Sequence, residues 1–212
     1  MQLYTYFRSS AAYRVRIALN LKGLAREDVF VRFQTGEQRG EAYRKLNPQG
    51  LVPTLVDDGH VLGQSLAILN YLDEVHPEPP LLPKDAAGRA RARQLGLIVA
   101  CDIHPLNNLR VLQYLERQLG LNQEQRNAWY RHWVAQGFAA LETLLTTTPG
   151  TGTFCHGDSP GFADICLVPQ VFNANRFRVE MTPYPTIARI NETCLALAAF
   201  ADAAPARQPD AE

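Results

Sequence analysis

The sequence predicts an α/β domain followed by an all-helical domain, and three observations support this prediction. The first is an alternation of strand-like and helical patterns over residues 1–75, in the order β-α-β and then β-β-α. The second is a stretch at residues 76–83 that holds four of the chain's 14 prolines and cannot be helical. The third is a series of helical patterns beyond that stretch. We place the domains at residues 1–80 and 84–212.

The first half of the α/β domain reads as strand, helix, strand and helix. A strand at residues 2–7 leads through a serine-containing turn into a helix at about residues 10–22, which Lys22-Gly23 ends. A second strand, residues 28–31, is rich in β-formers, and a short helix at residues 41–46 follows a polar turn. This order indicates a parallel β-α-β unit.

The second half of this domain reads as a hairpin followed by a helix. A strand at residues 52–56 is entered through Pro53, and a turn at residues 57–60 joins it to a short return strand. Ser65 is a natural N-cap for a helix that continues to Val75. The complete arrangement resembles the thioredoxin fold, in which the proline before the third strand is commonly cis.

The second domain reads as helical to its end. A proline inside a helix removes a hydrogen bond, so we expect Pro105 to kink the first and longest helix and Pro169 to be able to bend a later one. The polar tail is expected to fray or pack loosely. The expected segments are helices at residues 89–119, 122–145, 158–168 and 187–197, and the tail at residues 205–212.

Composition and charge exclude several classes of function. Lys plus Arg and Asp plus Glu both number 21, so bulk electrostatics gives no case for binding nucleic acid or an anionic membrane. No apolar run approaches the ~20 residues of a membrane helix, and no signal-peptide pattern opens the chain, so we expect a cytoplasmic protein. The four cysteines have neither Cys-x-x-Cys nor Cys/His metal spacing, which predicts reduced thiols and no metal site.

The turn before the first helix gives the clearest local indication of chemistry. Ser9 and Ser10 stand where a helix N-terminus presents unpaired N–H groups and the positive end of the helix dipole. Such a position stabilises an anion, including a thiolate. A purely structural role is the alternative, because serine is also a favoured N-cap residue. The residues alone leave both interpretations open.

A combination of motifs narrows the interpretation. Ser9-Ser10 is followed by the run Arg-Val-Arg-Ile-Ala-Leu at residues 14–19, and Gln64-Ser65 precedes a helix. Together with the two-domain organisation, these motifs resemble the zeta class of the cytosolic glutathione transferases, over nearly the whole chain. Further matching segments are Asn47-Pro48, residues 52–55, residues 166–171 and the region from Leu195 to Pro209.

The chain departs from the zeta pattern in two places. Ala11 and Ala12 replace the Cys-Ser pair that usually follows the two serines, so no cysteine is available there. Gly161 replaces the Ser or Thr of a helix-capping motif, of which only the acidic half, Asp164, remains. Glycine is still an acceptable N-cap, so the expected loss of stability is only about a few tenths of a kcal/mol.

The resemblance implies glutathione as the cofactor and assigns residues to the site. Ser9, with Ser10 as the second candidate, is expected to be the catalytic hydroxyl that stabilises the thiolate. Arg8, Arg110 and Arg176 are expected to bind substrate carboxylates, because the planar guanidinium pairs with them in bidentate fashion. The expected glutathione-binding residues are Ser9, Gln38, Gln49, Val52, Pro53, Gln64, Ser65, His104 and Asn108, with His104 and Asn108 on one helical face.

The resemblance also implies a reaction. A glutathione-dependent cis–trans isomerase would convert maleylacetoacetate to fumarylacetoacetate by reversible addition of the thiolate to the cis double bond. The closest alternative is the isomerisation of maleylpyruvate in gentisate degradation, and a second is transfer to, or dehalogenation of, small α-halo acids. A non-catalytic binding protein of the same fold is a third. The family further implies a dicarboxylate substrate and a homodimer.

Overall fold

The computed structural model describes residues 1–211 and divides the chain into two compact units. The first unit comprises Met1–Leu81 together with the chain from Ala196 onward, and the second comprises Leu82–Leu195. The predicted classes, α/β and all-helical, are confirmed. The chain from Ala196 onward, which the sequence analysis assigns to the second domain, is grouped with the α/β unit. We therefore propose a domain boundary after Leu81, with the tail assigned to the first domain.

A four-stranded mixed sheet forms the centre of the first unit, with the strand order β2-β1-β3-β4. Strand β1 (Gln2–Thr5) pairs in parallel with β2 (Glu27–Phe30), as the predicted β-α-β unit requires. It also pairs antiparallel with β3 (Thr54–Asp57), which forms the predicted hairpin with β4 (His60–Gly63). The Val52–Pro53 peptide bond that leads into β3 is cis.

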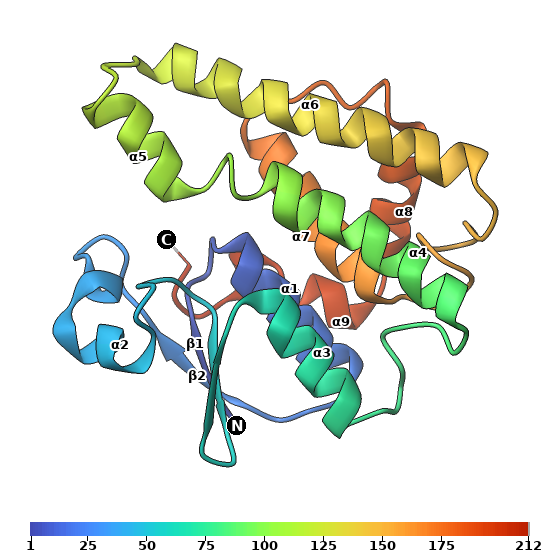
Figure 1. The fold of residues 1–212 in the computed structure, drawn as a ribbon, viewed down its shortest axis with the longest axis horizontal. Coiled ribbons are helices and arrows are strands. Elements are labelled where there is room, and N and C mark those ends of the chain that lie inside the picture. Colours follow the sequence, from blue (N-terminus) through green and yellow to red (C-terminus); the bar gives the residue numbers. More distant parts are fainter. Residues whose placement is uncertain (212) are drawn as a thin grey trace. The chain divides into compact units, whose positions relative to one another are not determined.

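Two helices of the first unit, α1 (Ser10–Leu21) and α3 (Ser65–Val75), pack against each other on one side of the sheet (Figure 1). The short helix α2 (Glu41–Leu46) lies on the other side. There Tyr43 packs with Tyr6, Phe7, Val31 and Val52 in a buried apolar cluster. The remaining helical elements of this unit are η1 (Glu37–Arg39), α9 (Ala198–Ala201) and η3 (Pro205–Arg207).

Lys22, at the end of α1, holds the proline-rich stretch against the first unit. Its Nζ lies 3.0 Å from Asp73 Oδ1 and donates to the carbonyl oxygens of His76 and Pro79 at 2.6 and 2.9 Å. The same Asp73 oxygen accepts from the Leu81 N–H at 2.7 Å. The predicted linker is therefore fixed by hydrogen bonds to a buried cation as well as by its prolines.

The second unit is helical, with one break that the sequence does not predict. Instead of one kinked helix over residues 89–119, there are two helices separated at Pro105. Because proline has no N–H to continue the helix, the chain turns there and begins again at Asn108, which caps the new helix. The elements are α4 (Ala86–Leu97), a π-helical segment η2 (Ile98–Ile103), α5 (Leu109–Arg117), α6 (Gln123–Thr147), α7 (Phe162–Arg176) and α8 (Pro185–Leu195).

Asp164 supports the start of α7, as the sequence predicts. Its Oδ2 accepts from the N–H of Gly161 and its Oδ1 accepts from the N–H of Cys155, each at 2.9 Å. Burial raises the pKa of this carboxyl. The acidic half of the capping motif therefore works without a capping hydroxyl, because it satisfies two backbone donors at once.

Candidate active site

The turn between β1 and α1 presents Ser9. A hydrogen bond of 3.0 Å from the Ser9 N–H to the Tyr6 carbonyl closes the turn. Ser9 is the N-cap of α1, and its Oγ accepts from the Ala12 N–H at 3.2 Å. Accepting that bond leaves the hydroxyl proton available for donation, so the same side chain can cap the helix and donate to a thiolate. Ser10 is the first helical residue and is 6% exposed, so Ser9 is the more accessible of the two hydroxyls.

Arg8 stands directly before Ser9, with an exposed side chain. Its Nη2 donates to the Tyr6 hydroxyl at 3.0 Å, and its guanidinium carbon lies 5.2 Å from the centroid of the Phe7 ring. These contacts hold the guanidinium on the rim of the turn, where it retains donors for an anion.

The start of α3 brings three of the predicted residues together. Gln64 lies in the left-handed region at φ 63°, an uncommon conformation for a residue other than glycine. Its Nε2 donates to Gln49 Oε1 at 2.7 Å. Gln64 takes the N-cap position, so the prediction of Ser65 as N-cap is wrong by one residue. Ser65 is instead the first residue of α3, beside the unpaired N–H groups of that helix.

Arg14 lies beneath Ser65 and is absent from the predicted site. Its Nη1 donates to Ser65 Oγ at 3.2 Å, and the residue is only 2% exposed. Arg16, two residues further along the same helix, is fully buried. Burial lowers the pKa of the Arg16 guanidinium to about 10, which leaves it charged at neutral pH. Helix α1 thus carries two buried cations.

Val52 offers its backbone for pairing. It is 7% exposed, and within residues 1–211 neither its N–H nor its C=O takes part in a hydrogen bond. The neighbouring Leu51 carbonyl, in contrast, accepts from the Tyr43 hydroxyl at 2.7 Å and from Asn47 Nδ2 at 2.8 Å. These bonds fix the loop that leads to the buried Pro53.

Gln38 is buried beside this loop, at 4% exposure. Its backbone lies so close to Gly50 that a Cβ there would stand 2.8 Å from the Gln38 carbonyl oxygen, and Gly50 has φ +62°. The Gln38 side-chain oxygen is buried and accepts no hydrogen bond within the described residues. This oxygen is therefore available to accept from a donor that the described residues do not supply.

Four predicted residues belong to the second unit, and the structure corrects one relationship among them. His104 and Asn108 do not share a helical face, because the chain leaves the helix between them at Pro105. Asn108 instead caps α5, with its Oδ1 accepting from the Arg110 N–H at 3.2 Å. Arg110 itself is exposed.

Arg176 is the last residue of α7 and is exposed. Its Nη1 donates to Asn173 Oδ1 at 3.4 Å, and its guanidinium carbon lies 5.4 Å from the Phe177 ring centroid. That ring stacks on Tyr130, with the centroids 3.6 Å apart. The arginine is therefore presented from a firmly packed helix end.

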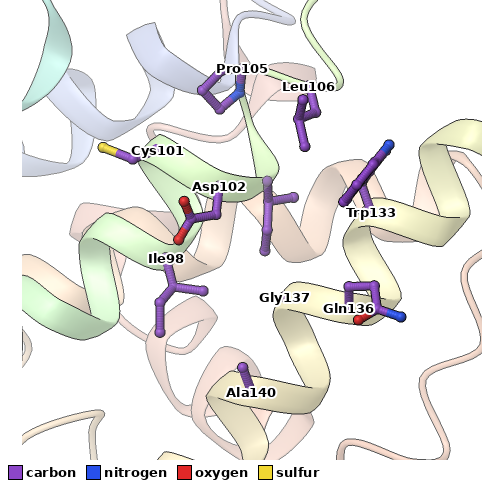
Figure 2. A pocket seen from close by; sticks show the side chains of 10 residues that line it. Ile98, Cys101, Asp102, Pro105, Leu106, Trp133, Gln136, Gly137 and Ala140 are labelled. Atoms are coloured by element: carbon purple, nitrogen blue, oxygen red, sulfur yellow. The ribbon is translucent and has the colours of Figure 1, made fainter.

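The second unit also contains a cavity of about 410 Å³ between η2 and α6 (Figure 2). Its walls include Ile103 and Trp133, and the Trp133 Nε1 is buried without a hydrogen-bond partner in the described chain. Gly137 permits close packing, because a Cβ there would stand 2.3 Å from the Ile103 side chain. None of the predicted site residues lines this cavity. The lining residues are Ile98, Cys101, Asp102, Ile103, Pro105, Leu106, Trp133, Gln136, Gly137 and Ala140.

The family model, the curated relatives and the solved structures that resemble this chain all point to the glutathione S-transferases. Residues 1–74 match the family model for the glutathione S-transferase N-terminal domain. The chain is 51% identical over 211 residues to a probable maleylacetoacetate isomerase of Vibrio cholerae, an alignment that covers 99% of this chain and 97% of that protein. The resemblance seen in the sequence motifs is thereby confirmed.

Two solved structures are also very similar over the full length of both chains. The holo structure of a maleylpyruvate isomerase, described as a bacterial glutathione S-transferase in the zeta class, has a TM-score of 0.98 and 48% identity. A maleylacetoacetate isomerase from Methylobacterium extorquens AM1, with bound malonate and glutathione, has a TM-score of 0.97 and 46% identity. Each alignment covers 100% of both chains.

Proposed function

The chain belongs to the zeta class of the glutathione S-transferase family, and on that premise we propose that it is a glutathione-dependent cis–trans isomerase. Its substrate is maleylacetoacetate, which it converts to fumarylacetoacetate; maleylpyruvate is the alternative, because relatives of nearly equal identity carry each name. The observation that carries the proposal is the β1–α1 turn, where the Ser9 hydroxyl and a helix N-terminus stand together.

The residues of the first unit fit glutathione. The unpaired N–H of Val52 can donate a hydrogen bond to a peptide and its C=O can accept one from it, in the manner of a β-strand. The buried Gln38 Oε1 lacks a donor, which a peptide N–H supplies. Ser65 and the N–H groups at the start of α3 suit a carboxylate, with Gln64 and Gln49 beside them. Pro53, which directly follows Val52 and is buried, restricts the conformation of this loop.

When bound, glutathione would supply a thiolate that adds to the cis double bond conjugated with the ketone, with the electron pair moving to the carbonyl oxygen; after rotation about the resulting single bond, cleavage of the C–S bond would return the thiolate and leave the trans alkene. Free thiols ionise near pH ~8.5, so the site must favour the ionised form at neutral pH. We assign that role to Ser9, whose hydroxyl donates while its oxygen caps α1, with Ser10 as the second candidate. The dipole of α1 acts in the same direction. Since residues 11 and 12 are alanines, this turn itself brings no cysteine thiol to the chemistry.

The substrate carries carboxylates, which require cations. We assign carboxylate binding to Arg8 and Arg176, with Arg110 as a further candidate, because each has an exposed side chain that ends in a planar guanidinium. His104 is a candidate for contact with glutathione or substrate. The Asn108 side-chain oxygen caps α5, so we assign a contact of Asn108 with a ligand to its amide nitrogen first.

The test is a direct comparison of substrates. Values of kcat/KM for maleylacetoacetate, maleylpyruvate and a small α-halo acid, each with glutathione, rank the three readings of the site. We expect the highest value for maleylacetoacetate. A higher value for maleylpyruvate would change the proposed substrate and leave the proposed mechanism intact. Turnover of the halo acid alone would show that the enzyme is a dehalogenase and not an isomerase.

We further propose a homodimer in the cytoplasm, in line with the family to which the chain belongs. No helix within residues 1–211 combines the length and apolar character needed to cross a membrane. Light scattering of the eluted protein and fractionation of cells test the two parts of this proposal. We propose no nucleic-acid partner, because the chain's formal net charge is zero.

A further inference from the structure

Phe7, two residues before Ser9, has both of its backbone polar groups held by side chains. Its N–H donates to Asp210 Oδ2 at 2.9 Å, across 203 residues of sequence. Its carbonyl oxygen accepts from Arg16 Nη2 at 3.0 Å. The turn that presents the Ser9 hydroxyl is therefore fixed from outside by a carboxylate and a guanidinium, and not by its own hydrogen bond alone.

Arg16 joins this turn to the end of the chain. The guanidinium that holds Phe7 also donates from Nε to the Ala203 carbonyl at 3.0 Å and from Nη1 to the Tyr6 carbonyl at 3.4 Å. Ala203 and Asp210 bound one stretch, residues 203–210, which we call the tail segment. The tail segment and the turn are thus two sides of one hydrogen-bonded network with Arg16 at its centre.

The tail segment is itself ordered. Gln208 Nε2 donates to the carbonyl oxygens of Asp202 and Ala204 at 2.8 and 3.0 Å, which closes the segment on itself. Upstream, the Tyr13 hydroxyl donates to the Phe200 carbonyl at 3.1 Å, which attaches the same region to α1. The expectation that residues 205–212 fray or pack loosely is wrong for the described residues 205–211, because Gln208 is buried and Asp210 accepts the Phe7 N–H; Glu212 lies outside the described residues.

Loss of a member of this network is expected to be destabilising, because its cation is buried and one carboxylate oxygen of the half-buried Asp210 is buried as well. Arg16 is fully buried, and the nearby charge of Asp210 partly offsets the effect of burial on its pKa. The second carboxylate oxygen of Asp210 is buried and has no hydrogen-bond partner in the described residues. Removing one member leaves the other members with unsatisfied buried groups.

We propose that Asp210 and Arg16 are positioning residues that act through the Phe7 backbone to hold the Ser9 hydroxyl in place for the glutathione thiolate. This inference rests on the proposed function, since it assigns the tail segment a role in that same site. A small displacement of the donor weakens its bond to a thiolate more than it weakens the binding of the rest of glutathione. A merely structural tail would change stability and leave the ionisation of the bound thiol unaltered.

The experiment compares three variants of the full chain. Asp210→Ala removes the acceptor, Asp210→Asn keeps an acceptor oxygen and removes the charge, and Asp202→Ala changes an exposed carboxylate next to the tail segment as a control. The pKa of glutathione bound to each folded variant is read from thiolate absorbance near 240 nm. Steady-state kinetics give kcat and the KM for glutathione.

For Asp210→Ala we expect the pKa of the bound thiol to rise toward its free value and kcat at neutral pH to fall about tenfold, with the KM for glutathione changed less than about twofold. Asp210→Asn should keep most of the activity, and Asp202→Ala should match the unchanged protein. An unaltered thiol pKa and kcat in Asp210→Ala would overturn the inference, as would equal losses in Asp210→Ala and Asp202→Ala.

Two further results separate the possible failures. If Asp210→Ala does not fold, Arg16→Lys replaces it, because lysine keeps the charge but cannot contact Phe7, Tyr6 and Ala203 together. That variant must show the same raised thiol pKa, and a normal value would contradict the inference. If the unchanged protein fails to ionise bound glutathione, the proposed function itself is wrong, whereas normal ionisation in every variant refutes only the role of the tail segment.

Discussion

Arg14 donates a 3.2 Å hydrogen bond to the Ser65 hydroxyl oxygen from a side chain that is 2% exposed. The bond joins the interior of α1 to the first residue of α3, where we place a carboxylate of glutathione. A buried guanidinium next to that helix N-terminus adds positive potential at the position where the helix already favours an anion. Arg14 is therefore expected to contribute to cofactor affinity without contacting solvent.

Arg14→Met is expected to weaken glutathione binding about tenfold, because a hydrogen bond next to a charged ligand group is lost. A glutathione analogue with 4-aminobutyrate in place of the γ-glutamyl residue lacks the α-carboxylate and should lose less than about twofold. Titration calorimetry with both ligands makes the measurement, and Arg32→Met, at an exposed arginine of the same unit, is the control. Equal losses for the two ligands would show that Arg14 only supports packing.

Ser9→Ala should reduce both stability and turnover, for separate reasons. Loss of the cap on α1 costs about 1 kcal/mol of unfolding free energy, and loss of the hydroxyl donor lowers kcat/KM about 100-fold. Ser9→Asp keeps a capping oxygen, so its stability should return to within about 0.5 kcal/mol while its activity stays low, because a second anion opposes the thiolate. Unchanged turnover in Ser9→Ala, with loss in Ser10→Ala, would transfer the role to Ser10.

Arg176→Ala should raise the KM for the diacid substrate about tenfold and leave glutathione affinity unaltered. Arg176→Lys keeps the charge but loses the fork, so it should recover only part of the affinity. Steady-state kinetics at saturating glutathione make the comparison, with Arg110→Ala measured in parallel. A KM equal to that of the unchanged protein would remove Arg176 from the substrate site.

Tyr130 should make stability depend on alkaline pH. Burial raises the pKa of its phenol to about 12, above the ~10 of an unfolded tyrosine. Between those values the unfolded state has lost the proton and the folded state has kept it, so stability must fall as pH rises from about 10 to 12, by up to about 2 kcal/mol. Urea unfolding at pH 9 and pH 11 should show a smaller decrease for Tyr130→Phe, and parallel decreases for both proteins would contradict this.

Much of the fold follows from local chemistry in the sequence. The hairpin turn at Asp57–His60, the capping of α6 by Asn122 and the entry into α1 through Ser9 each use residues with a strong conformational preference. The break at Pro105 is predicted as a kink, but the switch to a new helix depends on the Asn108 cap three residues later. Whether a proline only bends a helix or ends it, so that a new helix begins, depends on tertiary packing, and the local sequence pattern does not contain that information.

The residues that support the site are harder to predict than the residues that form it. Ser9, Gln64 and Ser65 are signalled by helix starts and by the motif around them. Arg14 and Arg16 alternate with apolar residues, and arginines are ordinarily exposed, so their burial cannot be inferred from the pattern. Asp210 contacts Phe7 from 203 residues away, and nothing local to either residue indicates that pairing.

The most direct test of the account follows maleylacetoacetate with and without glutathione by proton NMR of the vinyl hydrogens. We predict conversion of the cis to the trans isomer that saturates with glutathione, with glutathione recovered unchanged and with S-methylglutathione unable to replace it, because the methyl group blocks the thiolate. Equal rates of isomerisation without glutathione, or none in its presence, would contradict a thiolate mechanism at the β1–α1 turn.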